Sequence, residues 1–174
     1  MIALEPGDIG LIDHRDFFGW LEGLYARKYK EGTQIATHGF IVKSPPIITE
    51  ATGVFIKDAD IKEYDGVPMW IFRNRSLTVD AWHLMATYIE ATENGQGHYG
   101  FGGILAFAKS YFTGVRRFQN AAGEFCTDLT GEIIKAAGLP YLTNLNPWEV
   151  DPTTQLNWFL NGGAALGWEL VYRQ

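Results

Sequence analysis

Hydrophobic positions change their spacing partway along the chain. In the first part, short apolar runs are separated by glycine, proline and charged residues, which is typical of β-strands joined by turns. We predict strands at residues 8–12, 35–42, 47–50, 54–56 and 69–73. The segment Ser44-Pro45-Pro46 ends the second strand, because proline lacks the amide hydrogen that a strand ladder needs.

A helical spacing replaces this pattern after residue 77, and one earlier segment shares it. Apolar side chains recur three and four residues apart, which gives each predicted helix one apolar face. The predicted helices run from Asp13 or Asp16 to near Gly32, from Thr78 or Asp80 to about residue 93, and over 104–111, 125–137 and 152–160. A glycine-rich loop at 95–103 and a last strand at 168–172 complete the pattern. Strands and helices are largely segregated along the chain, which favours an α+β fold.

Composition supports one globular unit. The chain has 174 residues, of which 47% are hydrophobic and 20% charged, so it can bury a substantial core. No internal repeat or linker divides it, and we expect a single domain over 1–174. Aromatic residues make up 14% of the chain and can fill that core, line a groove, or do both.

Charge and hydropathy exclude several classes of partner. The net charge of −6 disfavours nucleic-acid binding, which needs a dominant positive field. No apolar run is long enough to span a membrane, and the first residues do not resemble a secretory signal. A single cysteine excludes an intrachain disulfide. We therefore expect a cytoplasmic protein, or one that is delivered without a cleavable signal, as an effector or a phage protein.

Three common site motifs are weak or missing. The segment 95–100 matches G-x-G-x-x-G, but a predicted helix precedes it, whereas the dinucleotide fingerprint follows a strand. None of the three serines stands in a G-x-S-x-G turn, so serine hydrolase chemistry is poorly supported. The four histidines show no metal-ligand spacing. We expect no metal site and no cofactor.

Cys126 stands where a thiol becomes reactive. It falls in the predicted first turn of the helix at 125–137, where unpaired amides and the helix dipole favour the thiolate. The same residue also lies on an apolar stripe with Leu129, Ile133 and Ala137, as a small core residue would. Both interpretations remain open from the sequence.

A thiolate nucleophile needs a base, and the base needs a residue that orients it. His38 stands in the strand predicted at 35–42, and Glu50 ends the next one, twelve residues later. If these strands pair, the carboxylate can face the imidazole across the ladder and hold its tautomer. Taken singly, His38 can instead be a hydrogen-bonded sheet histidine, and Glu50 a solvated strand end.

These segments together resemble a known family. In order they are Pro6-Gly7-Asp8-Ile9-Gly10, Thr37-His38-Gly39-Phe40-Ile41-Val42, Ile48-Thr49-Glu50-Ala51 and Phe125-Cys126-Thr127-Asp128-Leu129. This order is similar to the circularly permuted branch of the NlpC-type papain-like cysteine hydrolases, which includes YiiX-like proteins and relatives of lecithin:retinol acyltransferase. In that branch the histidine and a polar residue precede the cysteine, whereas ordinary papain-like enzymes have the cysteine first.

The resemblance implies a fold and a set of roles. The fold would be a small antiparallel sheet with helices on one side. Cys126 matches the nucleophile, His38 the base and Glu50 the orienting residue. Tyr99 matches a family tyrosine that is often followed by aspartate, but here Gly100 follows, which weakens the match.

The implied activity is that of a thiol hydrolase, a cysteine peptidase or amidase that cleaves an amide bond in a peptide or peptidoglycan fragment. Two alternatives stay open: a lipid amidase or acyltransferase of the same fold, and a non-catalytic binding or structural module, such as a virion component. Trp82, Tyr99 and Phe101 are the aromatic candidates for substrate binding. The substrate is accordingly a small molecule, a peptide or a lipid.

Overall fold

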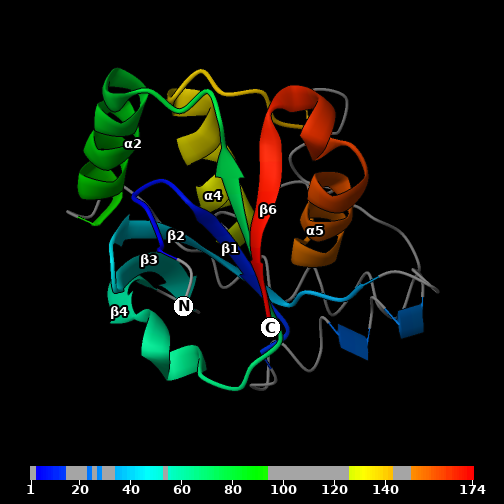
Figure 1. Ribbon diagram of the computed structural model, residues 1–174. Coiled ribbons are helices and arrows are strands. Elements are labelled where there is room, and N and C mark those ends of the chain that lie inside the picture. The colour runs from blue at the N-terminus through cyan, green and yellow to red at the C-terminus, as the bar shows by residue number, and fades with distance from the viewer. Residues whose placement is uncertain are drawn as a thin grey trace, which may run out of the picture.

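The computed structural model describes residues 3–14, 23–24, 27–28, 34–52, 55–93, 126–142 and 150–174. The strands in this part of the chain are β1 (Ile9–Ile12), β2 (His38–Ser44), β3 (Ile47–Thr52), β4 (Phe55–Asp60), β5 (Met69–Asn74) and β6 (Trp168–Arg173). They form one sheet in the order β4-β3-β2-β1-β5-β6, and every neighbouring pair is antiparallel (Figure 1). The predicted α+β class with an antiparallel sheet is confirmed.

The helices begin and end near residues that typically cap helices. Those of the described part are α2 (Val79–Ala91), α4 (Cys126–Ala136) and α5 (Pro152–Asn161). The side chain of Thr78 accepts a hydrogen bond from the Ala81 amide, and that of Asp151 accepts one from the Thr154 amide, so both cap a helix N-terminus. Gly138 follows α4 with φ at +68°, a conformation that glycine adopts without strain.

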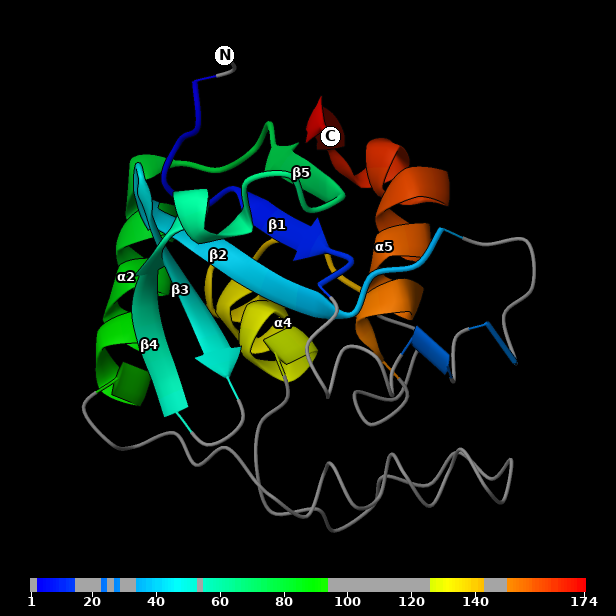
Figure 2. The ribbon, with the colours of Figure 1, turned by 90° about the horizontal axis from the view of Figure 1, so that it is seen from below.

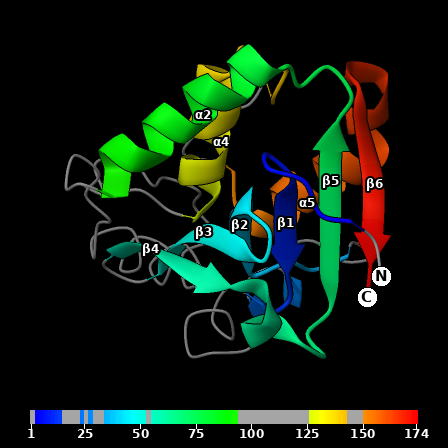
Figure 3. The ribbon, with the colours of Figure 1, turned by 60° about the vertical axis from the view of Figure 1, so that its left-hand side comes forward.

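All three helices pack on one face of the sheet (Figure 3). A single apolar cluster joins Met85 and Ile89 of α2, Leu129 and Ile133 of α4, and Leu156 and Phe159 of α5 to Ile9, Leu11, Ile41, Ala51 and Phe72 of the sheet. Burial of these side chains is the main stabilising contribution to the fold. The predicted arrangement, with helices on one side, is thus confirmed.

The opposite face carries a smaller apolar cluster. It contains Ile12, Phe40, Val42, Ile48, Met69 and Ile71, together with Tyr64. Tyr64 ends the short 3-10 helix η1 (Ile61–Tyr64), which follows β4 and lies away from α4 (Figure 2). A β-carbon on Gly10 would lie 2.0 Å from Phe40 Cζ, so only glycine leaves room for this ring to cross β1.

Some predicted elements fall outside this description. The loop at 95–103 and the helix at 104–111 lie outside the described residues, as does most of the helix predicted to end near Gly32. The other predicted strands and helices agree with the observed elements to within a few residues. No helix in the described part combines the length and the apolar character needed to cross a membrane.

Candidate active site

Two neighbouring strands bring a histidine and a glutamate together. His38 is the first residue of β2, and Glu50 lies near the end of β3. His38 Nε2 lies 2.9 Å from Glu50 Oε2, which is hydrogen-bonding distance. The side chain of Glu50 is 1% exposed and that of His38 is 15% exposed. The carboxylate is therefore buried, whereas part of the imidazole reaches the surface.

A β-bulge decides that these two side chains share a face. Along the β2–β3 ladder the register shifts by one residue at Lys43, so that Glu50 lies opposite Phe40. Side chains alternate between faces, and His38 therefore points to the same side as Phe40 and Glu50. Without the bulge, Glu50 would lie on the other side. The pair is diagonal in the ladder rather than directly opposite, a separation that long side chains can bridge.

Glu50 is a buried carboxylate with several partners. Its Oε2 accepts hydrogen bonds from His38 Nε2 and from the hydroxyl of Tyr64. The Lys57 ammonium lies 3.3 Å from Oε1. Burial alone would raise the pKa of Glu50, but the hydrogen bond and charge of His38, the Tyr64 hydroxyl and the Lys57 charge outweigh it and hold the pKa below its usual value. Glu50 is therefore ionised at neutral pH.

The negative charge of Glu50 determines which nitrogen of the His38 imidazole carries the proton. An ionised carboxylate only accepts hydrogen bonds, so His38 Nε2 must be the donor. In neutral His38 the proton then sits on Nε2, and Nδ1 carries the free lone pair. A carboxylate in this position also stabilises the imidazolium that forms when Nδ1 takes up a proton. The pair has the properties of an oriented base.

Cys126 is the first residue of α4. Its amide therefore belongs to the helix N-terminus, where amides without helical partners and the helix dipole favour negative charge. Its side chain lies outside the described part of the structure. The sequence predicted Cys126 in the first turn of a helix over 125–137, and the observed helix begins at Cys126.

A buried polar network holds α4 against β2. Gln155 of α5 is fully buried, and its Nε2 lies 2.9 Å from Thr130 Oγ1, one turn after Cys126. A β-carbon on Gly39 would lie 3.6 Å from Gln155 Oε1, and Gly39 directly follows His38. The first turns of α4 and the first residues of β2 are therefore neighbours, although His38 itself points to the far face.

The aromatic residues predicted to bind substrate have different outcomes. Tyr99 and Phe101 lie outside the described residues. Trp82 is on α2, half-buried against the main apolar cluster and beside Gly7. The Gly7 amide bonds to the Val42 carbonyl, near the far end of β2 from His38. The structure therefore does not bring Trp82 to the His38–Glu50 pair.

Tyr64 and Lys57 contact Glu50, and the sequence singled out neither of them. Tyr64 is 6% exposed, and its ring stacks on Phe40 with 6.1 Å between centroids. The segment Glu63-Tyr64-Asp65-Gly66 reads as an ordinary turn. Only the three-dimensional course of β4 and η1 brings the hydroxyl to Glu50, so no sequence pattern indicates this contact.

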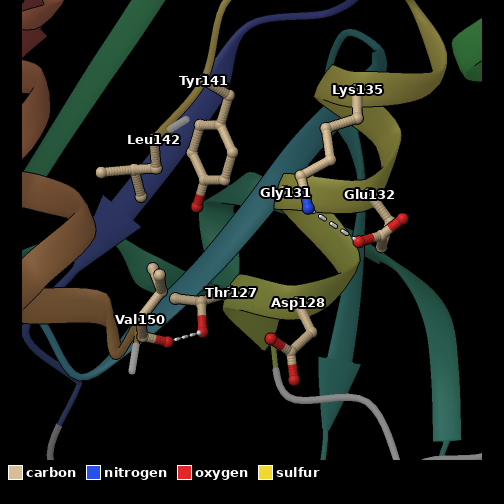
Figure 4. A pocket seen from close by; sticks show the side chains of 8 residues that line it. All are labelled: Thr127, Asp128, Gly131, Glu132, Lys135, Tyr141, Leu142 and Val150. Atoms are coloured by element: carbon tan, nitrogen blue, oxygen red, sulfur yellow. Dashed lines mark hydrogen bonds and ion pairs between the residues drawn. The ribbon is translucent and has the colours of Figure 1, made fainter. Parts of the chain in front are cut away.

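A small pocket lies beside the first turns of α4 (Figure 4). Its walls combine charged and apolar side chains, namely Thr127, Asp128, Glu132, Lys135, Tyr141, Leu142 and Val150, with Gly131 between them. Lys135 Nζ lies 3.0 Å from Glu132 Oε1, three residues earlier on the same helix. The Thr127 hydroxyl donates to the Val150 carbonyl at 2.8 Å and joins α4 to the segment before α5.

Comparison with known proteins identifies the fold. No protein-family model matches the sequence, and no curated protein matches it. Among solved structures, the crystal structure of the metalloprotein YiiX from Escherichia coli O157:H7 aligns with 98% of this chain and 97% of its own. The TM-score is 0.57 and the sequence identity is 14%.

At this identity the likeness concerns the fold alone. YiiX has the permuted papain-like fold of the NlpC type, and this chain therefore has that fold over its whole length. The resemblance predicted from the order of the His38, Glu50 and Cys126 segments is confirmed at the level of fold. The fold is that of YiiX-like papain-like hydrolases.

Proposed function

We propose that the protein is a thiol hydrolase with Cys126 as nucleophile, His38 as base and Glu50 as the residue that orients His38. The observation that carries this proposal is the 2.9 Å contact between His38 Nε2 and the buried carboxylate of Glu50, in a permuted papain-like fold. The helix that begins at Cys126 supports it, since a helix start activates a thiol.

The reaction proceeds in two steps. His38 Nδ1 takes the thiol proton, and the Cys126 sulfur attacks the carbonyl carbon of the substrate. The tetrahedral intermediate collapses to a thioester while the imidazolium returns the proton to the leaving amine. Water, deprotonated by the same nitrogen, then cleaves the thioester and releases the acid. The Cys126 amide at the helix N-terminus is suited to stabilise the oxyanion.

The helix that carries Cys126 and the side chain of His38 lie on opposite faces of the sheet. α4 packs on the face of Ile41 and Ala51, whereas His38 and Glu50 point to the other face. The Cys126 thiol must therefore meet the imidazole beyond the start of β2. The chain before His38 continues beside β1, where the Thr37 amide donates to the Ile12 carbonyl at 2.8 Å, so the thiol has to reach the imidazole around this segment.

The pocket beside α4 favours a polar substrate. Asp128, Glu132 and Lys135 make its walls polar, with Lys135 paired to Glu132 at 3.0 Å, and polar walls suit the amide groups of a peptide better than an acyl chain. We therefore place an amide bond in a peptide or peptidoglycan fragment ahead of an acyl lipid. Arg73 is not available as a substrate clamp, because its guanidinium binds Asp8 at 2.8 Å.

A metal is not part of this proposal. YiiX is described as a metalloprotein. In this chain, no three His, Cys, Asp or Glu side chains among the described residues lie together as metal ligands. His38 Nε2 and Glu50 Oε2 are directed at one another, and the Lys57 ammonium faces the other carboxylate oxygen. The pair therefore does not fit a cation, and no reaction step is assigned to one.

The substrate test compares two panels. Purified protein is incubated with muropeptides and, separately, with fatty-acyl amides and esters, and mass spectrometry is used to detect products against the Cys126→Ala variant. Cysteine-dependent cleavage of the muropeptides is the expected result. Release of fatty acid with intact muropeptides would instead indicate the lipid amidase, and inactivity on both panels would favour a non-catalytic module.

A further inference from the structure

The contacts of Tyr64 give it a fixed place beside Glu50. It ends η1, whose first turn is capped by Asp60 through a 2.9 Å bond from the Lys62 amide to Asp60 Oδ1. Its ring is parallel to that of Phe40, at an interplanar angle of 1°, and lies edge-on to His14 with 5.4 Å between centroids. Packing on both sides of the ring leaves the hydroxyl little freedom of direction.

The hydroxyl donates to the same carboxylate oxygen that accepts from His38. Glu50 Oε2 thus receives two hydrogen bonds, one from β2 and one from η1. The other oxygen, Oε1, accepts no hydrogen bond from the described residues, and the Lys57 ammonium of β4 lies 3.3 Å from it. Three elements therefore direct positive or hydrogen-bonding groups at one buried carboxylate.

We infer that Tyr64 is a positioning residue: its hydroxyl holds the Glu50 carboxylate in the orientation and ionised form in which it accepts from His38 Nε2. The inference rests on the proposed function, because it matters for catalysis only if His38 Nδ1 is the base. The Tyr64 and His38 rings lie 6.4 Å apart between centroids, and the hydroxyl acts on His38 through the Glu50 carboxylate that both side chains bond.

We expect two linked changes when the Tyr64 hydroxyl is removed. Glu50 loses a donor, so its ionised form becomes less favourable and its pKa rises. The carboxylate is also free to rotate, so the hydrogen bond that keeps the proton on His38 Nε2 becomes less populated. Lys57, 46% exposed, compensates little, because solvent screens its charge.

The experiment measures Glu50 and His38 directly in the Tyr64→Phe variant. Carbon-13 NMR of the glutamate carboxyl follows the titration of Glu50, and nitrogen-15 NMR of the imidazole reports which His38 nitrogen carries the proton. Tyr172→Phe is the control, because the Tyr172 hydroxyl on β6 donates to Gln174 Oε1 at 2.7 Å, away from Glu50. We expect a higher Glu50 midpoint and a smaller Nε2–H fraction in Tyr64→Phe only.

Turnover supplies a readout that a purely structural role would not change. In Tyr64→Phe we expect kcat to fall about tenfold with KM nearly unchanged, as loss of one hydrogen bond to a charged group predicts. A fall in kcat without any change in the NMR of Glu50 or His38 would overturn the inference.

A second variant keeps the test decisive if Tyr64→Phe does not fold. Incorporation of 3-fluorotyrosine at position 64 preserves the shape of the ring and makes its hydroxyl a stronger donor. The Glu50 midpoint should then move down, opposite to the effect of Tyr64→Phe, and an unchanged midpoint would refute the inference. If Glu50 and His38 respond as expected but the wild-type protein cleaves no substrate, the positioning role of Tyr64 holds and the proposed hydrolase function fails.

Discussion

Replacement of Glu50 by glutamine tests whether its charge stabilises the fold as the structure implies. The substitution keeps the size of the side chain and one acceptor oxygen but removes the negative charge. Glu50 accepts from His38 and Tyr64 and lies 3.3 Å from the Lys57 ammonium. The glutamine carbonyl oxygen can still accept from both donors, but it carries no negative charge.

The expected loss of stability depends on pH. At pH 7 the variant should be less stable by about 2 kcal/mol, because two hydrogen bonds to a charged acceptor become weaker bonds to a neutral one. The pKa of Glu50 in the folded state lies below its ordinary value, so its ionisation stabilises the fold fully above the unfolded pKa of ~4.3. That stabilisation is lost as pH falls through the lower, folded pKa. Each unit between the two values appears as about 1.4 kcal/mol of change in the difference between wild type and variant.

Urea denaturation at a series of pH values from 7 to 3 measures this difference. The other carboxylates are the same in both proteins, so their contributions cancel in the comparison. Glu63→Gln, an exposed neighbour of Tyr64 on η1, is the matched control and should show no such trend. A difference that stays constant down to pH 3, or increases as pH falls, would refute the reasoning.

Two further predictions follow from the site and from the packing below it. His38→Ala should lower turnover by ~10² to 10⁴-fold, whereas His83→Ala on the exposed side of α2 should leave turnover unchanged. The reverse result would show that His38 is not the base. Gly10→Ala should destabilise the fold by about 1–3 kcal/mol in thermal unfolding, because the new methyl group meets the Phe40 ring, and Phe40→Leu in the same chain should recover part of the loss. An additive double variant would contradict the second prediction.

Local signals account for most of the fold that the sequence predicted. Capping by Thr78 and Asp151, and the left-handed Gly138, are properties of a few adjacent residues. The strands were predicted because their apolar runs are bounded by turn residues. The antiparallel sheet with helices on one side came from the resemblance to the permuted family, and the match with YiiX confirms it.

The site could be predicted only in part, because its geometry depends on register and on distant segments. The spacing of His38 and Glu50 suggested a pair. The register shift at Lys43, which puts both side chains on one face of the sheet, could not be predicted from the sequence. Trp82 was chosen as an aromatic residue close to the reactive segment in sequence, and it packs beside Gly7 instead. Tyr64 was missed because its contact depends on where η1 crosses the sheet.

The most direct test of the central claim is the pH dependence of thiol alkylation. The chain has one cysteine, so the rate of reaction with iodoacetamide reports Cys126 without ambiguity. If His38 is its base, the wild-type rate should titrate with an apparent pKa well below ~8.5, and His38→Ala should restore an ordinary thiol profile. A wild-type thiol that titrates near ~8.5 and is indifferent to His38→Ala would contradict the assignment of Cys126 and His38 as a catalytic pair.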